Sequence, residues 1–165
     1  MTSFEDLYNT YFKRVYAYIF SRVRNHATAE DLCAVAWKNA YEHWASFDEQ
    51  KGEFTQWIFT IARNQTNMYW RLYWVKNVFS LTEEAAPEYA GDSPLKNLEQ
   101  DTFRRDLTNA LGKLSARERD ILALKFYSGL NNRQIAQVSQ LSESNVGTII
   151  NRAVTKMRKG MKNYD

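Results

Sequence analysis

Hydrophobic residues recur at helical spacing along most of the chain, and no useful stretch alternates as a half-buried strand would. Before residue 80 the spacing predicts three long helices. The first begins at Ser3, the second runs from Thr28 to Trp44, and the third follows a loop over residues 47–53 and extends toward Trp74. After that the pattern predicts four shorter helices, the first over about residues 94–111. The predicted fold class is therefore all-α.

Capping signals mark several of these helix ends. Asp6 follows Ser3 by three residues and Glu118 follows Ser115 by three, the spacing of a capping box. Gly129 is a plausible C-terminal stop for the helix that Ser115 opens. Ser142 is a good N-cap for the last helix, which is expected over about residues 143–159.

One segment breaks the helical pattern. Both prolines, Pro87 and Pro94, lie within residues 80–97 with Gly91 between them, and the segment is acidic and poor in large apolar groups. Such a composition is typical of a flexible linker. The sequence therefore predicts two small helical domains, over residues 1–79 and 99–165, joined by a linker over residues 80–98.

Residues 132–152 have the spacing of a helix-turn-helix. Ala136 is small enough to let two helices cross closely, and Ile135, Leu141 and Val146 stand where such a motif packs its helices together. Two residues depart from the usual pattern, because Gln140 stands where the turn often has Gly and Ser139 where an apolar residue is common. The pattern predicts binding to duplex DNA, with the second helix in the major groove. An ordinary helical hairpin in an all-α core is the alternative.

The distribution of charge favours the DNA interpretation. The net charge of +3 divides into +1 for residues 1–78, −4 for residues 79–100 and +6 for residues 101–165. The positive end therefore carries the helix-turn-helix, as phosphate binding requires. Aromatic residues are just as uneven, since 19 of 24 lie before residue 80. Some of these rings are expected to face a partner or to stack on nucleobases.

The remaining composition narrows the class of protein. A single cysteine, Cys33, excludes an internal disulfide, and no apolar run has the length of a membrane span. The N-terminus lacks the basic and apolar blocks of a signal peptide. The expected location is therefore the cytoplasm, without membrane insertion. No metal-ligand spacing, Gly-rich phosphate loop or catalytic triad is visible, so we expect neither a cofactor nor an enzyme.

Two motif blocks resemble a known family. Residues 29–32 (AEDL) and 54–64 (FTQWIFTIARN) resemble the core of region 2 of bacterial sigma factors, and residues 114–130 (LSARERDILALKFYSGL) resemble the start of region 4. The size and the two-domain order resemble the extracytoplasmic-function group of the sigma-70 family. The resemblance implies a dissociable subunit that directs core RNA polymerase to promoter DNA and helps to melt it, and that an anti-sigma protein can restrain.

The resemblance also implies roles for residues of the first domain. Its second helix would dock on polymerase, through Glu30, Asp31, Val35, Lys38 and Glu42. The loop that follows would capture a flipped base, through Asp48, Glu49, Gln50, Lys51 and Gly52. The third helix would hold the melted strand, through Arg63, Asn64, Asn67 and Arg71, with Trp57, Trp70 and Trp74 as candidate stacking groups.

In the second domain the resemblance implies contacts to a duplex promoter element. Arg117 and Arg119 would lie near the DNA backbone. The helix-turn-helix would contribute Arg133, Ser144, Asn145, Thr148, Asn151, Arg152 and Lys156, the last two within a basic tail that also contains Arg158 and Lys159. Relatives often carry Lys or Arg where this chain has Gly147 and Ile149, so the recognition helix lacks a charged group at these two positions.

Two other functions fit parts of the sequence. A free-standing helix-turn-helix regulator would bind duplex DNA without polymerase, but it leaves the aromatic N-terminal domain without a role. A protein-interaction module that has lost DNA recognition is favoured by Gly147 and Ile149. Such a module would bind polymerase or another protein and show no salt-sensitive affinity for DNA.

Overall fold

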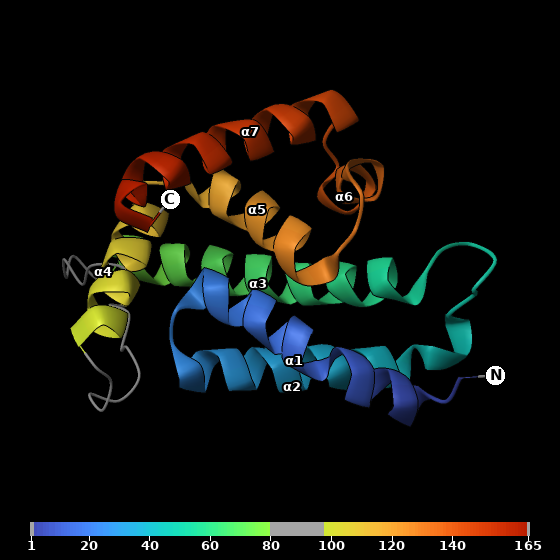
Figure 1. Ribbon diagram of the computed structural model, residues 1–165. Coiled ribbons are helices and arrows are strands. Elements are labelled where there is room, and N and C mark those ends of the chain that lie inside the picture. The colour runs from blue at the N-terminus through green and yellow to red at the C-terminus, as the bar shows by residue number, and fades with distance from the viewer. Residues whose placement is uncertain (1, 80–97, 165) are drawn as a thin grey trace. The chain divides into compact units, whose positions relative to one another are not determined.

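The computed structural model describes residues 2–79 and 98–164, and within them every regular element is helical, which confirms the all-α prediction (Figure 1). The predicted linker falls almost entirely outside the described residues. The α-helices are α1 (Phe4–Val23), α2 (His26–Glu42), α3 (Phe54–Phe79), α4 (Leu98–Gly112), α5 (Ala116–Ser128), α6 (Asn132–Ser139) and α7 (Glu143–Gly160). Two 3-10 turns, η1 (Trp44–Ser46) and η2 (Lys162–Tyr164), complete the set.

Local hydrogen bonds explain where the first helices begin and end. Ser3 caps α1 as predicted, its hydroxyl accepting from the backbone N–H of Asp6 at 3.1 Å. The predicted start of α2 at Thr28 is wrong by two residues, because Asn25 is the N-cap and its side-chain oxygen accepts from the Thr28 N–H at 3.0 Å. The helix ends at Glu42, so Trp44 lies in η1 rather than in α2. Helix α3 continues past Trp74 to Phe79.

The close backbone contacts divide the chain into two units, each with its own core. In the first unit α1, α2 and α3 each contact the other two. Its most buried large side chains include Tyr18 and Phe59, whose rings meet edge to face at 5.8 Å. Near the N-terminus of α3 a second group of rings packs in edge-to-face, tilted and stacked pairs (Phe4, Trp37, Trp44, Phe47, Phe54 and Trp57). Much of the aromatic excess is thus used for packing.

The second unit contains α4, α6, α7 and most of α5, and its core is mainly aliphatic. The large side chains of this core include Ile121, Leu124, Ile135, Val146 and Ile149. Helix α7 makes close backbone contacts with α6 and α4. The contact with α4 is tight, since a Cβ added to Gly160 would lie 2.7 Å from the Cβ of Ala110.

Two isolated residues with possible chemistry, Cys33 and His43, have local structural surroundings. Cys33 is buried in the first unit, and burial raises the pKa of its thiol to about 11, so the thiol stays protonated at neutral pH. His43 Nδ1 lies 2.8 Å from the backbone carbonyl of Asn39, one turn back in α2. None of the described helices combines the length and apolar character needed to cross a bilayer.

Candidate nucleic-acid and polymerase interface

The helix-turn-helix predicted from the sequence is formed by α6 and α7. Asn131 and Gln134 make a reciprocal capping box at the start of α6. The turn closes through a hydrogen bond of 3.1 Å from the Leu141 N–H to the Ala136 carbonyl. Ser142 then caps α7, its hydroxyl accepting from the Asn145 N–H at 3.0 Å. The first turn of α7 is therefore held in a defined conformation before any ligand arrives.

Both departures from the usual turn sequence have a structural explanation. Gln140 adopts the left-handed conformation with φ 59° and ψ 35°, which Gly would adopt without the steric cost of about 1–2 kcal/mol that a Cβ brings. Ser139 is buried where an apolar residue is common, and its hydroxyl donates to the Ile135 carbonyl at 2.7 Å. The polar atom is satisfied within its own helix, so Ser139 is compatible with the core.

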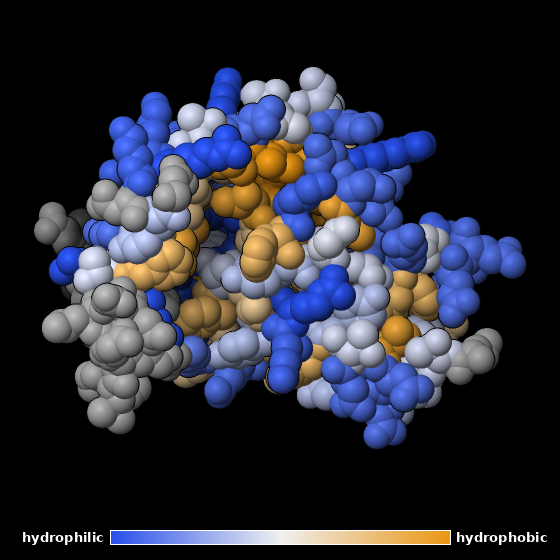
Figure 2. Space-filling model, viewed as in Figure 1, coloured by the Kyte–Doolittle hydropathy of each residue, from blue (hydrophilic) through white to orange (hydrophobic). Residues whose placement is uncertain are grey.

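One side of α7 is exposed and polar, with hydrophilic side chains along its outer edge in Figure 2. Every residue predicted from the helix-turn-helix to contact DNA is exposed, namely Arg133 in α6 and Ser144, Asn145, Thr148, Asn151, Arg152 and Lys156 in α7. Thr155 is exposed on the same side and was missed by the sequence analysis. It follows Thr148 by seven residues, which is the spacing that could have revealed it.

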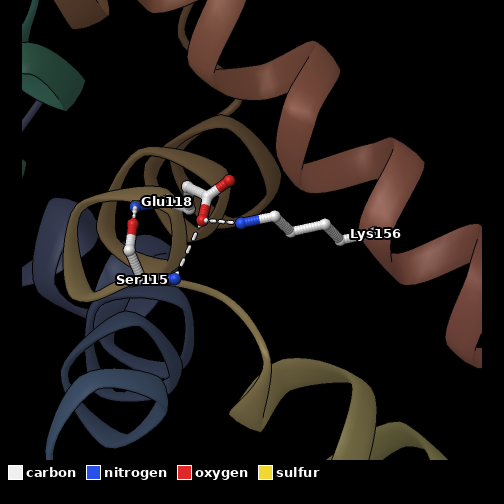
Figure 3. Close-up of polar contacts among 3 residues, drawn as sticks. All are labelled: Ser115, Glu118 and Lys156. Atoms are coloured by element: carbon white, nitrogen blue, oxygen red, sulfur yellow. Dashed lines mark hydrogen bonds and ion pairs between the residues drawn. The ribbon is translucent and has the colours of Figure 1, made fainter.

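At the start of α5 the predicted capping box is present. The Ser115 hydroxyl accepts from the Glu118 N–H at 3.1 Å, and the Glu118 carboxylate accepts from the Ser115 N–H at 2.9 Å. Of the two predicted backbone contacts here, Arg117 is exposed and Arg119 half-buried. Lys156 of α7 donates to the same Glu118 oxygen, Oε1, at 2.7 Å (Figure 3). Lys156 is thus exposed but already engaged with a carboxylate.

The pKa of Glu118 is lowered from the ordinary range of a glutamate. The hydrogen bond from Lys156 is the largest cause and the Ser115 backbone N–H the next, while burial opposes both. The side chain of Glu118 is only 9% exposed, against 46% for Lys156. The carboxylate is therefore ionised at neutral pH although little of it meets water.

In the first unit residues 48–53 of the loop before α3 are exposed, and every predicted base-capturing residue lies among them: Asp48, Glu49, Gln50, Lys51 and Gly52. The carboxylate of Asp48 accepts from the Gln50 N–H at 2.9 Å, and the Asp48 carbonyl accepts from the Lys51 N–H at 3.0 Å. These bonds give the loop a local turn structure. The side chain of Asp48 is thereby partly occupied, and Gln50 and Lys51 are exposed residues of the same turn.

Helix α3 presents the four predicted strand-binding residues within roughly 100° of its circumference. Asn64 and Arg71 are exposed, and Arg63 and Asn67 are half-buried. Trp74 is 61% exposed and continues this side of the helix, seven residues beyond Asn67. Trp70 is half-buried against Tyr69 and Tyr73, and Trp57 belongs to the ring cluster near η1. Of the three tryptophans predicted as stacking groups, Trp74 is the most exposed.

Helix α2 presents the predicted polymerase-binding residues as an exposed stripe. Asp31, Val35, Lys38 and Glu42 follow one another at four-, three- and four-residue steps, and Glu30 is exposed beside them. Lys38 Nζ lies 3.9 Å from the Glu42 carboxylate, a separation typical of a weak surface ion pair. Tyr41 was missed by the sequence analysis; it is 68% exposed and lies three residues after Lys38, next to the stripe.

Among the described residues, no group of three or more His, Cys, Asp or Glu side chains is arranged to hold a metal ion. The exposed faces described above carry mainly polar and charged side chains. Arginine, asparagine and hydroxyl groups on exposed helix faces suit contacts to phosphates and base edges. Charged and apolar groups in one stripe suit a protein partner.

Comparison with known proteins identifies both halves of the chain. Residues 7–74 match the family model described as sigma-70 region 2, and residues 104–157 match the one described as sigma-70, region 4. RNA polymerase sigma factor YlaC of Bacillus subtilis is 30% identical over 161 residues, which cover 96% of this chain and 92% of YlaC. The ECF RNA polymerase sigma factor BldN of Streptomyces coelicolor is 27% identical over 95% of this chain, which spans 60% of BldN.

A solved structure has the same fold. The sigma factor RpoE of Bartonella quintana, determined in complex with the anti-sigma factor NepR, superposes with a TM-score of 0.82 at 21% identity, covering 98% of each chain. The two matched regions lie in the order that the sequence motifs indicated, and both consist of helices that carry the exposed faces described above. The chain belongs to the sigma-70 family of RNA polymerase sigma factors, in the extracytoplasmic-function group.

Proposed function

We propose that this chain binds core RNA polymerase through α2, opens promoter DNA with the loop before α3 and with α3 itself, and reads an upstream duplex element with α7. In this proposal residues 1–79 form the polymerase-binding and melting domain, and residues 99–165 form the duplex-binding domain. The chain acts as a regulator of transcription in the cytoplasm, and nucleotide polymerisation belongs to the polymerase.

The stripe on α2 supports the docking step. It combines two acidic residues, one cation and the half-exposed apolar side chain of Val35, all on one rigid helix. Exposed charges lose little of their hydration when they form a weak contact. Such a stripe therefore suits a partner that associates and dissociates repeatedly. Tyr41 adds a large ring next to it, which is the kind of side chain that dominates binding energy at interfaces.

The loop and α3 support the melting step. Exposed amide and cationic groups in the loop can pair with the edge of an extruded base, while Arg63 and Arg71 hold the strand by its phosphates. Trp74 offers a ring face on which an unstacked base can stack, an interaction worth about 1–3 kcal/mol. Cation, amide and ring thus share one side of α3.

The exposed face of α7 is the observation that carries the proposal. Its first turn is capped by Ser142, and Ser144, Asn145 and Thr148 place short polar groups where a recognition helix meets base edges. Arg152 follows two turns later, where a phosphate contact is expected. These residues stand in a chain that also carries the polymerase-binding region of the family, which a free-standing DNA-binding regulator does not need.

Run-off transcription tests the proposal directly. Core polymerase, the full chain and a pool of genomic fragments are mixed, and the 5′ ends of the transcripts are sequenced. Discrete starts that share two spaced upstream elements are expected. If the polymerase gains no start sites while the chain alone retains duplex fragments, the function is that of a free-standing regulator. If neither occurs, the chain is an interaction module.

Two variants separate the two steps. Val35→Asp places a carboxylate in the apolar part of the α2 stripe and is expected to lower the affinity for core polymerase. Asn145→Ala on α7 is expected to leave that affinity unchanged and to reduce starts at the selected promoters. Lys13→Gln, at an exposed position of α1 outside both surfaces, is the matched control and is expected to change neither.

We also propose that an anti-sigma protein restrains this chain. The related RpoE was determined with its anti-sigma factor NepR, and a sigma factor that is not restrained competes for polymerase at all times. Affinity purification from the native cell is expected to recover a further protein besides polymerase subunits. Recovery of polymerase subunits alone would count against such a partner.

A further inference from the structure

One buried carboxylate links the two parts of the second unit that are proposed to meet DNA. Glu118 Oε1 accepts from the Ser115 backbone N–H at 2.9 Å and from Lys156 Nζ at 2.7 Å, so it joins the first turn of α5 to the second half of α7 (Figure 3). Arg117 and Arg119 lie on that first turn, on either side of Glu118. The single oxygen atom Oε1 of Glu118 therefore contacts both the start of α5 and the second half of α7.

The link joins α7 to a helix with which its backbone has fewer close contacts than with α4 or α6. In the described structure α7 makes most of its close backbone contacts with α4 and α6. Toward its N-terminus α7 is held by the buried side chains of Val146, Ile149 and Ala153. Beyond Ala153 the long side chain of Lys156 reaches α5 and ends on Glu118. The ion pair is thus a specific side-chain bridge between α5 and α7.

The environment of the pair favours a fixed geometry. Glu118 is nearly enclosed, and its second oxygen, Oε2, is buried without a hydrogen-bond partner among the described residues. Lys156 therefore supplies the main compensation for a buried negative charge, and leaving that charge unpaired is costly. A lysine held in this way is poorly available as a mobile phosphate contact.

We propose that Lys156 and Glu118 are positioning residues, which set the orientation of the recognition helix relative to the start of α5 and so determine how well α7 reads its promoter element. The inference rests on the proposed function. It differs from the sequence prediction, in which Lys156 neutralises a phosphate. Lys156 lies 14 residues from the Ser142 cap, or about 20 Å along the helix, so a tilt of about 5° would move the first turn by about 2 Å. Such a shift exceeds the tolerance of a hydrogen bond.

The two roles predict different responses to salt. A lysine that neutralises a phosphate contributes about 0.9 to the slope of the logarithm of the DNA-binding constant against the logarithm of the salt concentration. It makes this contribution for any DNA sequence. A positioning pair carries no net charge, so its removal leaves the slope unchanged. It lowers instead the ratio of affinities for the correct and the scrambled element. A pair that only stabilised the fold would change neither the slope nor the ratio.

The test uses holoenzyme assembled from core polymerase and the full chain. The probes are a promoter found by run-off transcription and the same duplex with its upstream element scrambled, titrated from about 50 to about 200 mM salt. The double variant Glu118→Gln/Lys156→Met removes both charges together and leaves no unpaired ion. We expect the ratio of its affinities for the two probes to fall about tenfold. The slope of its affinity against salt should stay that of the wild-type chain. Lys156→Arg keeps the cation and is expected to retain discrimination within about twofold.

Arg152→Gln is the matched control on the same helix, and it is expected to lower the slope with little change in discrimination. Circular dichroism confirms that each variant is folded at the binding temperature. Unchanged discrimination in the double variant, or a slope lowered by about 0.9, would overturn the inference. If the wild-type holoenzyme itself finds no promoter, the proposed function fails and this inference fails with it.

Discussion

The two units of this protein are stabilised by different means. In the first, large rings fill the space among three long helices, as Tyr18 and Phe59 do at its centre. In the second, smaller aliphatic side chains are supplemented by contacts at single points, such as Gly160 against Ala110 and Lys156 on Glu118. The first unit therefore depends mainly on buried volume, whereas the second depends also on exact local geometry.

The comparison can be tested separately in each unit, because all five tryptophans lie before residue 80. Tryptophan fluorescence therefore reports on the first unit alone, whereas circular dichroism reports on both. A change seen by circular dichroism without a matching change in fluorescence belongs to the second unit.

The largest effect is expected from removal of a ring in the first core. Phe59→Ala leaves a cavity beside Tyr18 that the neighbouring helices cannot close, and it should lower the free energy of unfolding by about 3–5 kcal/mol. Denaturant titration followed by tryptophan fluorescence measures the change. The matched control is Leu72→Ala at an exposed position of the same unit, with an expected change below about 0.5 kcal/mol. Equal losses in the two variants would contradict the volume argument.

In the second unit an added methyl group should be destabilising. A Cβ at position 160 would lie 2.7 Å from that of Ala110, so Gly160→Ala must push α4 and α7 apart, at a cost of about 1–3 kcal/mol. Circular dichroism should show the loss while fluorescence stays unchanged. Gly112→Ala is the control, since nothing lies within 4 Å of its added Cβ. If Ala110→Gly fails to restore part of the stability lost in Gly160→Ala, the close approach is not the cause.

The buried carboxylate makes the second unit sensitive to acid. The pKa of Glu118 is lower in the folded chain than in the unfolded one, so the unfolded state binds its proton first as the pH falls. Its stabilisation is complete above the ordinary glutamate pKa of about 4.3 and is lost as the pH falls through the lowered folded-state value. Glu118→Gln should cost about 1–2 kcal/mol near neutral pH, and the difference from the wild-type chain should shrink in acid.

Thermal unfolding followed by circular dichroism, repeated at a series of pH values, measures that difference. The stability of the double variant Glu118→Gln/Lys156→Met should depend on pH as weakly as that of Glu118→Gln alone. A difference between Glu118→Gln and the wild-type chain that stays constant from about pH 6 to about pH 3 would mean that the carboxylate is not the titrating group.

The sequence was sufficient for features that depend on nearby residues. The cap at Ser142, the capping box at Ser115 and the spacing of the α2 stripe all follow from residues within a few turns of one another, and the structure confirms the two caps. The start of α2 was misplaced because Asn25 and Thr28 are both good caps and only the folded chain selects between them. The bridge from Lys156 to Glu118 joins residues 38 positions apart, so local periodicity could not reveal it.

The smallest expected effect is a gain in stability in the same helix that Gly160→Ala disrupts. Gly147 lies inside α7, and a Cβ there would meet only the side-chain amide nitrogen of Asn132, at an ordinary contact distance of 3.8 Å. Gly147→Ala restricts the unfolded chain and should add about 0.5–1 kcal/mol to the free energy of unfolding. The two substitutions are chemically identical and lie in one helix, so opposite signs would show that a methyl group stabilises α7 wherever its neighbours leave room. A loss of stability in Gly147→Ala would mean that this part of α7 also depends on close packing. The expected difference in sign between Gly147→Ala and Gly160→Ala would then be wrong.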